Sequence, residues 1–273
     1  MTFARCSKFA LLPRLAGAFV FALSLALAGC GASSNLALTQ GNWSMTATQT
    51  GGGGTPNSTF YIGGNLTQNG GSLAGTMSIV NSLCYSSSQT VTFTGSVKGD
   101  NVTLTSASVG GEVITVTATG TSGSSLTGDY SIAGGNTCDG DTGSITANPV
   151  PSVSGTWGGP IYSQGGVSQG GPNAALALTL TQATTASADG TYALTGSGVF
   201  SNSSCSNTAT VSNAFIAGPY LVVNGTTDDG GTYSYDQVLL NNSAAPSSMT
   251  GSYSVSGGNC DGDLDNSTFT LAQ

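Results

Sequence analysis

The sequence contains one motif twice: residues 126–141 read Leu-Thr-Gly-Asp-Tyr-Ser-Ile-Ala-Gly-Gly-Asn-Thr-Cys-Asp-Gly-Asp, and residues 249–263 read Met-Thr-Gly-Ser-Tyr-Ser-Val-Ser-Gly-Gly-Asn-Cys-Asp-Gly-Asp. Each copy predicts a strand that ends in a glycine-rich loop carrying a cysteine. Each copy also lies towards the end of a block of similar size. The chain is therefore expected to contain one structural unit twice, in tandem.

Further matches follow in the same order along both halves, with shifts that drift from 114 to 123 positions. They are Gly41-Asn-Trp43 with Gly155-Thr-Trp157, Leu66-Thr-Gln68 with Leu180-Thr-Gln182, Leu73-Ala-Gly75 with Leu194-Thr-Gly196, and Cys84 with Cys205. Ordered matches with small drifts indicate a duplication with loop insertions. We predict a leader at 1–29, a tether at 30–39, a first repeat at 40–148, a proline-containing linker at 149–152 and a second repeat at 153–273.

After the leader, apolar and polar residues alternate with a period of two, which is typical of strands with one buried face. Leu176, Leu178 and Leu180, for example, share one face. Glycine and Asp-Gly turns separate the strands, and the short connections predict antiparallel meanders. The expected strands are 42–49, 58–68, 72–80, 88–97, 101–108, 112–119, 125–132 and 142–147, then 155–162, 174–182, 190–200, 207–216, 219–225, 231–240, 248–255 and 266–272. The fold class is all-β, with two eight-stranded meanders closed as barrels or folded as sandwiches.

The leader has a basic start and an apolar run from about Leu15 to Leu27, as secretory signals do. The run ends in Leu27-Ala28-Gly29-Cys30, which resembles the lipobox of bacterial lipoproteins. That resemblance implies that Cys30 is acylated and becomes the mature N-terminus, with the membrane as a partner through the lipid. Gly31 follows the cysteine in place of the aspartate associated with inner-membrane retention in enteric bacteria, which favours the outer membrane.

The charge balance excludes whole classes of partner. Three of the four basic residues lie in the leader, so Lys98 alone remains against twelve acidic residues, a net charge of −11. Nucleic-acid binding requires lysine and arginine at the phosphates, and we expect none. The chain has no histidine, so the usual base for a serine or cysteine nucleophile is missing, and we expect no enzymatic activity and no cofactor.

Four cysteines remain once Cys6 leaves with the leader and Cys30 takes the lipid: Cys84, Cys138, Cys205 and Cys260. Three pairings are possible. The repeat favours one within each half, Cys84–Cys138 and Cys205–Cys260, at separations of 54 and 55 positions. A metal site is the alternative, but an oxidising compartment and the absence of histidine favour the disulfides.

Gly41-Asn-Trp43 and Gly155-Thr-Trp157, each on the first strand of a meander, resemble the Gly-x-Trp of lipocalins and other calycins. The Leu-Thr-Gly-x-Tyr strand at Leu126 adds to this likeness. The resemblance implies a barrel in which Trp43 and Trp157 close the base. It does not extend to the ligand, because the mature chain lacks the arginine that packs over the lipocalin tryptophan and the tryptophan set of the avidin site.

The densest acidic cluster is Asp261-Gly-Asp263-Leu-Asp265. Alternating aspartates in a glycine-rich loop can present oxygens to Ca²⁺, and a solvated turn beside a disulfide is the alternative. For the whole chain we expect an envelope lipoprotein that binds a small apolar ligand in a calycin-like cavity. The alternative is a structural or adhesive envelope protein with filled barrels, and cavity volume distinguishes the two.

Overall fold

The structure is a computed structural model, and it describes residues 35–52, 58–85, 89–135, 138–162, 170–203, 206–241, 243–260 and 267–273. The leader and the lipobox cysteine, Cys30, lie outside these ranges. Within them, no helix has the length and apolar character of a membrane span.

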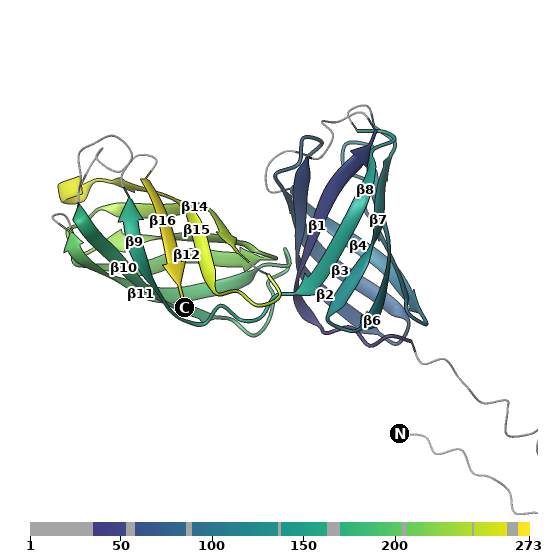
Figure 1. The fold of residues 1–273 in the computed structure, drawn as a ribbon, viewed down its shortest axis with the longest axis horizontal. Coiled ribbons are helices and arrows are strands. Elements are labelled where there is room, and N and C mark those ends of the chain that lie inside the picture. The colour runs from purple at the N-terminus through teal and green to yellow at the C-terminus, as the bar shows by residue number, and fades with distance from the viewer. Residues whose placement is uncertain are drawn as a thin grey trace, which may run out of the picture. The chain divides into compact units, whose positions relative to one another are not determined.

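The described chain forms sixteen strands, as the alternating sequence pattern predicts (Figure 1). The first eight are β1 (Gly41–Gly51), β2 (Thr59–Asn69), β3 (Ser72–Val80), β4 (Gln89–Lys98), β5 (Asn101–Ser106), β6 (Val113–Ser122), β7 (Ser125–Ala133) and β8 (Thr142–Pro149). The second eight are β9 (Gly155–Tyr162), β10 (Gly170–Gln182), β11 (Tyr192–Ser203), β12 (Thr208–Ala217), β13 (Tyr220–Thr227), β14 (Thr232–Leu240), β15 (Ser248–Ser256) and β16 (Ser267–Ala272). One short 3-10 turn, η1 (Gly258–Cys260), precedes β16.

Each set of eight strands closes into an antiparallel barrel. Consecutive strands pair with each other, and closure comes from β1 pairing with β8 and from β9 pairing with β16. Barrels are thus confirmed over sandwiches, and the architecture is consistent with a calycin-like fold. Closure leaves no unpaired sheet edge, which protects threonine- and valine-rich strands from pairing with other chains.

Alternating side chains fill the first barrel, because successive residues of a strand point to opposite faces. The inward positions carry the largest fully buried side chains of this half: Trp43, Met45, Ile62, Leu66, Met77, Ile79, Phe93, Leu104, Ile114 and Ile132. An eight-stranded barrel has an interior that side chains of this size just fill. The first barrel therefore has a packed core.

The second barrel is packed around a cluster of aromatic rings. Tyr233, Tyr235, Tyr253 and Phe269 are buried, with ring centroids of neighbouring pairs 5.0–6.4 Å apart. Gly225 makes room for this cluster, since a Cβ there would collide with the Tyr233 ring. Such aromatic pairs stabilise a core beyond the area that they bury.

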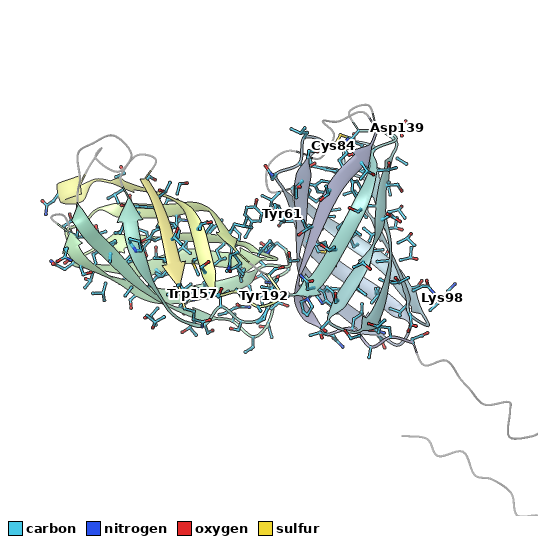
Figure 2. The ribbon with its side chains drawn as sticks, in the orientation of Figure 1. Tyr61, Cys84, Lys98, Asp139, Trp157 and Tyr192 are labelled. Atoms are coloured by element: carbon cyan, nitrogen blue, oxygen red, sulfur yellow. A yellow bond between two sulfur atoms is a disulfide. The ribbon has the colours of Figure 1, made fainter. Side chains whose placement is uncertain are left out.

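Each barrel holds a buried tryptophan near the start of its first strand by the same kind of hydrogen bond. Trp43 and Trp157 are fully buried, and each indole N–H donates to the carbonyl oxygen four residues earlier, that of Thr39 at 2.6 Å and that of Val153 at 2.9 Å. Figure 2 shows Trp157 within its barrel. The segment that enters each barrel is thus tied to the first strand.

A matching pair of glutamines holds the same entering segments. Gln68 accepts from the backbone N–H of Leu38 at 2.7 Å, and Gln182 accepts from that of Val153 at 3.0 Å. These glutamines end the Leu-Thr-Gln matches of the repeat. The duplication therefore extends to individual hydrogen bonds.

Candidate functional site

Two polar side chains on the outer face of β1 are buried, although the outer face of a barrel strand normally faces solvent. Asn42 is 5% exposed and Ser44 is 1% exposed. Asn42 is covered by the turn between β12 and β13, which belongs to the second barrel. The two barrels therefore share a contact surface, here called the junction, in addition to the chain that links them.

Asn42 fixes the junction with a pair of hydrogen bonds to one residue of the β12–β13 turn. Its Nδ2 donates to the carbonyl oxygen of Gly218 at 3.1 Å, and the N–H of Gly218 donates to its Oδ1 at 2.7 Å. Both groups of Gly218 are thereby satisfied in a buried place, which is what burial of backbone polar groups requires. The Cα atoms of Gly63 and Gly218 face each other so closely that a Cβ on either would lie 2.5 Å from the other.

A second turn of the second barrel also presses against the first barrel. The Asp189-Gly190 turn precedes β11, and a Cβ at Gly190 would collide with the backbone of Thr76 on β3. The Tyr192 hydroxyl donates to Asn65 Oδ1 at 2.7 Å. Together with the Asn42–Gly218 pair, these contacts hold the barrels at two turns.

Next to these contacts lies a cavity of about 360 Å³, here called the junction groove. Its lining residues are Ser78, Val80, Asn81 and Thr90 from the first barrel, with Asp189, Thr191, Phe215, Ala217, Tyr220, Leu221 and Val222 from the second. Phe215 and Val222 are cross-strand partners on the outer face of β12 and β13. The groove thus combines an apolar wall with a few polar groups, as small-molecule sites do.

Another cavity lies beside the junction groove. Its volume is about 310 Å³, it is lined by Thr46, Tyr61, Pro219 and Leu239 among others, and it has a more polar lining. The Tyr61 and Tyr220 rings meet edge to face, with centroids 5.4 Å apart. The junction therefore offers space of the size that a small ligand needs.

The predicted Cys84–Cys138 disulfide is confirmed, with Cα atoms 5.7 Å apart. It joins the loop after β3 to the loop after β7 at one end of the first barrel (Figure 2). The second predicted disulfide, Cys205–Cys260, cannot be compared with the structure. Cys205 lies outside the described residues, and the side chain of Cys260 is not described.

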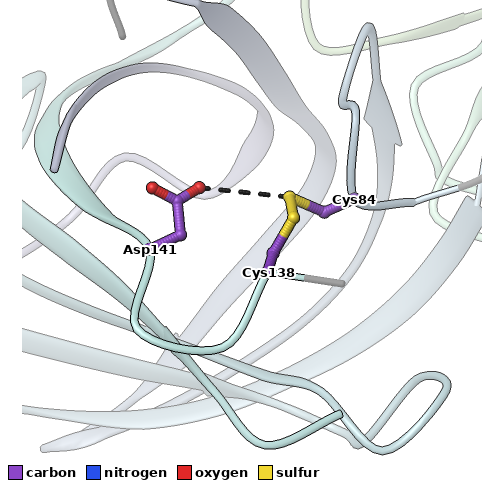
Figure 3. Close-up of side chains that lie close together, drawn as sticks. All are labelled: Cys84, Cys138 and Asp141. Carbon is purple, nitrogen blue, oxygen red and sulfur yellow. Dashed lines mark hydrogen bonds between the residues drawn. A yellow bond between two sulfur atoms is a disulfide. The ribbon is translucent and has the colours of Figure 1, made fainter. Parts of the chain in front are cut away.

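Buried acids lie beneath this disulfide. Asp141 is 2% exposed, and its Oδ2 lies 4.0 Å from the Cys84 sulfur (Figure 3). A disulfide sulfur carries no proton, so this is a contact and adds no donor. Burial raises the pKa of Asp141, although the Gln49 side chain, the Thr142 N–H and the Tyr130 hydroxyl act in the opposite direction.

Two further polar groups belong to the same buried region. Glu112 accepts from the N–H of Cys138 at 2.9 Å, and the buried Tyr85 hydroxyl has no hydrogen-bond partner among the described residues. Burial, then the charges of Glu112 and Asp141, raise the Tyr85 pKa. The disulfide end of the first barrel therefore contains a group of buried acidic and phenolic side chains.

This region also contains the cluster of potential metal ligands that the described residues bring together, namely Cys84, Cys138 and Asp141. The disulfide removes both thiolates, which are the forms that bind metal. Asp139, the other acid of this loop, instead accepts from the N–H of Gly134 at 2.9 Å. The predicted calcium ligands, Asp261, Asp263 and Asp265, lie outside the described residues.

The corresponding end of the second barrel is organised by an ionised carboxylate. Asp229 accepts from the Thr227 hydroxyl, from the N–H of Asn259 at 2.6 Å and from the Ser206 hydroxyl at 3.2 Å. These bonds, led by that from Thr227, lower the pKa of Asp229 to about 2. Burial thus raises the pKa of Asp141 in the first barrel, whereas hydrogen bonds lower the pKa of Asp229 in the second.

No protein-family model matches this chain, and no curated protein matches it.

Sequence reasoning did not identify the junction, but a signal for it is present. Residues 214–217 read Ala-Phe-Ile-Ala and residues 220–223 read Tyr-Leu-Val-Val, so both runs are apolar without alternation. Unbroken apolar runs are typical of strands that are covered on both faces. Apolar runs do not indicate the roles of Asn42 and Asp189, because those roles depend on contacts with the other barrel.

Proposed function

We propose that this chain is a membrane-anchored bacterial envelope lipoprotein that binds a small apolar ligand in the junction groove. The observation that carries the binding proposal is the groove itself, about 360 Å³ with an apolar wall that includes Phe215 and Val222. Small-molecule sites occupy about 300–1,000 Å³ and favour the boundaries between domains. Large buried side chains occupy the barrel interiors where the sequence places the ligand, so the binding proposal depends on the groove, and the filled barrels count towards the structural or adhesive alternative.

The contacts beside the groove support binding because they hold its walls in place. The Asn42–Gly218 hydrogen bonds and the Asp189-Gly190 turn tie the barrels on either side of it. A pre-formed site loses less conformational entropy when the ligand binds. A ligand would therefore meet an ordered surface.

A neutral apolar dye, N-phenyl-1-naphthylamine, tests this proposal by its fluorescence gain on binding. Val222→Trp fills the groove and is expected to weaken dye binding about tenfold or more. The matched control is Val199→Trp, because Val199 is 54% exposed on the outer face of β11 and does not line the groove. Equal dye binding by both variants, or none by the unmodified protein, would contradict the proposal.

The lipid anchor is proposed from the Leu27-Ala28-Gly29-Cys30 motif. Two or more acyl chains give stable membrane attachment, since each buried methylene contributes about 0.8 kcal/mol. Labelling with palmitate in a bacterial host is expected to mark the protein, and Cys30→Ser is expected to abolish the label. Retention of label by Cys30→Ser would place the acylation elsewhere.

A structural or adhesive role is the second candidate, and the outer face of the first barrel favours it. Strand pairing sets hydroxyl-bearing and other polar residues side by side in rows that cross β5, β6, β7, β8 and β1. One such row is Thr103, Thr117, Asp129, Ser144 and Thr48, and another is Asn101, Thr119, Thr127, Thr146 and Thr46. Rows of hydroxyls at the strand spacing can hydrogen-bond an extended polysaccharide.

Retention on insoluble polysaccharides distinguishes this second role from ligand binding. The double variant Thr117→Val and Thr127→Val removes hydroxyls from two rows while it preserves the side-chain shape. We expect reduced retention of this variant and unchanged dye binding if the outer face is adhesive. Unchanged retention would count against adhesion through this face.

A further inference from the structure

We propose that the junction groove selects small aromatic molecules that carry a protonated amine over their carboxylate counterparts, and that Asp189 is the residue that selects them. This inference rests on the proposed function, because it names the chemical class of the ligand for the same site.

The apolar part of the ligand is defined by the wall of the groove. Phe215, Leu221 and Val222 line the second-barrel side, and Val80 lies on the first-barrel side. Phe215 is half-buried, so part of its side chain remains accessible. A flat ring that enters this space gains apolar contact with these side chains, at about 25 cal/mol for each Å² removed from water.

The polar part is defined by an incompletely used carboxylate. Asp189 Oδ1 accepts two hydrogen bonds from Thr191, one from its N–H at 3.1 Å and one from its hydroxyl at 2.8 Å. The other oxygen, Oδ2, has no partner in the described part of the chain. Thr191 thus orients the carboxylate at the edge of the groove and leaves one oxygen to accept from a ligand.

Thr191 itself is well placed to fix this orientation. It is 8% exposed, and its carbonyl oxygen accepts from the N–H of Ser187 at 2.8 Å, which closes the turn. The next residue after Asp189 is Gly190, whose positive φ and close approach to Thr76 hold the turn against the first barrel. The hydrogen bonds of Thr191 and the Gly190 turn therefore set the position of the Asp189 carboxylate.

The charge of the rest of the protein acts in the same direction. Lys98 is the only lysine or arginine in residues 35–273, and it does not line the groove. Twelve acidic residues make the field around the folded chain negative. This field attracts a cation and repels an anion in general, and Asp189 adds the local contact at the groove.

A matched series of fluorescent probes tests the inference: 1-naphthylmethylamine, 1-naphthalenemethanol and 1-naphthoate share one ring system and differ in charge. Fluorescence anisotropy is expected to give a dissociation constant about fivefold lower for the amine than for the alcohol, with the carboxylate weakest. A fivefold ratio corresponds to about 1 kcal/mol, the upper range for exposed ion pairs.

Asp189→Asn removes the charge and keeps an oxygen for Thr191. This variant is expected to lose most of the preference for the amine over the alcohol, whereas the control Asp129→Asn, which removes one charge from the exposed outer face of β7, keeps it. Added salt should reduce the preference as well, because exposed charges are screened.

The outcomes separate the inference from the proposed function. If the alcohol binds and Val222→Trp abolishes its binding, the groove is a site. Equal affinity for the three probes, or a preference unchanged by Asp189→Asn, would then overturn the amine selectivity alone. If neither the alcohol nor the amine binds, both the inference and the binding function fail.

Discussion

Two side chains that are two residues apart on β1 contribute in opposite ways to the junction. Asn42 is buried and makes two hydrogen bonds to Gly218, whereas the buried Ser44 hydroxyl has no partner among the described residues. A polar group that is buried and satisfied stabilises a structure, and one that is unsatisfied costs about 1–3 kcal/mol. The same strand face therefore contains a stabilising and a destabilising residue.

Asn42→Ala is expected to lower the free energy of unfolding by about 2–4 kcal/mol, because the N–H and carbonyl of Gly218 lose their partners. Ser44→Ala is expected to leave it unchanged or raise it by up to about 1 kcal/mol. Urea denaturation followed by tryptophan fluorescence measures both. A loss of stability in Ser44→Ala as large as that in Asn42→Ala would show that burial alone, and not the hydrogen bonds, sets the effect.

The buried Asp141 predicts an unusual pH dependence. Its folded-state pKa is raised above the ordinary value of 3.8, mainly by burial. The protonated form is thus favoured by folding, and the stability that it contributes is fully present below the unfolded-state pKa and is lost as the pH rises through the folded-state pKa. Asp141→Asn is expected to remove this decline and to be more stable than the unmodified protein at neutral pH.

Thermal melting of the first barrel between pH 3 and pH 7 measures this effect. The control is Asp129→Asn, an exposed aspartate on the outer face of β7, which should keep the decline. Parallel pH profiles for Asp141→Asn and the unmodified protein would refute the assignment to Asp141. Asp229 contributes with the opposite sign, because its lowered pKa gives stability that is lost only as the pH falls towards about 2.

At the scale of elements, the disulfide joins two loops that close one end of the first barrel. Cys84 follows β3 and Cys138 precedes β8, with 54 positions between them. Closing a loop of that length restricts the unfolded chain by about 4 kcal/mol in the chain-entropy description. The disulfide stabilises the protein mainly because it lowers the entropy of the unfolded chain.

The double variant Cys84→Ser and Cys138→Ser is expected to lose about 4 kcal/mol of stability while it keeps the barrel fold. Circular dichroism checks the fold, and urea denaturation monitored at Trp43 measures the stability. The same shift should appear when the unmodified protein is reduced. A loss below about 1 kcal/mol would show that the loops are held by other contacts, such as those of Glu112 and Asp141.

The strands themselves differ between the two barrels in a way that the repeat does not reveal. The pairing register shifts within β10–β11, β11–β12, β12–β13, β13–β14 and β14–β15 of the second barrel, and within β1–β8 and β6–β7 of the first. Such irregularities bend strands and re-aim side chains. In β12 the slip leaves Phe215 on the outer face, where it lines the groove.

At the scale of the whole molecule, the junction predicts that the two barrels unfold together. Gly218 has φ +58° and faces Gly63, so an added Cβ would force the barrels apart. Gly99 has φ +59° with open space around it, so Gly99→Ala carries the backbone cost alone, about 1–2 kcal/mol. Gly218→Ala is expected to separate the unfolding of the barrels, and Gly99→Ala is not.

Each barrel contains one buried tryptophan, so tryptophan fluorescence can report the unfolding of each barrel separately. Trp157→Phe leaves Trp43 to report on the first barrel, and Trp43→Phe leaves Trp157 to report on the second. Combined with Gly218→Ala, the two reporters should give different urea midpoints, while with Gly99→Ala they should coincide. Coincident midpoints in Gly218→Ala would mean that the junction does not couple the barrels.

The sequence by itself determined the all-β class, the two eight-stranded units and the Cys84–Cys138 pairing. These features depend on local periodicity, on turn residues and on a repeat, all of which are visible along the chain. The burial of Trp43 and Trp157 near the start of their first strands agrees with the resemblance to calycins. The segment at 149–152, which the sequence predicts as a linker, also contacts the first barrel, because Val150 is buried and its N–H donates to the Asn42 carbonyl oxygen.

Only the tertiary structure decided where space for a ligand exists. The interior of a barrel depends on how side chains from eight strands meet, and the junction depends on residues as distant as Asn42 and Gly218. Neither arrangement has a local signature, because it arises from contacts between segments that are far apart in sequence. The groove therefore depends on the packing of one barrel against the other, which the sequence does not show.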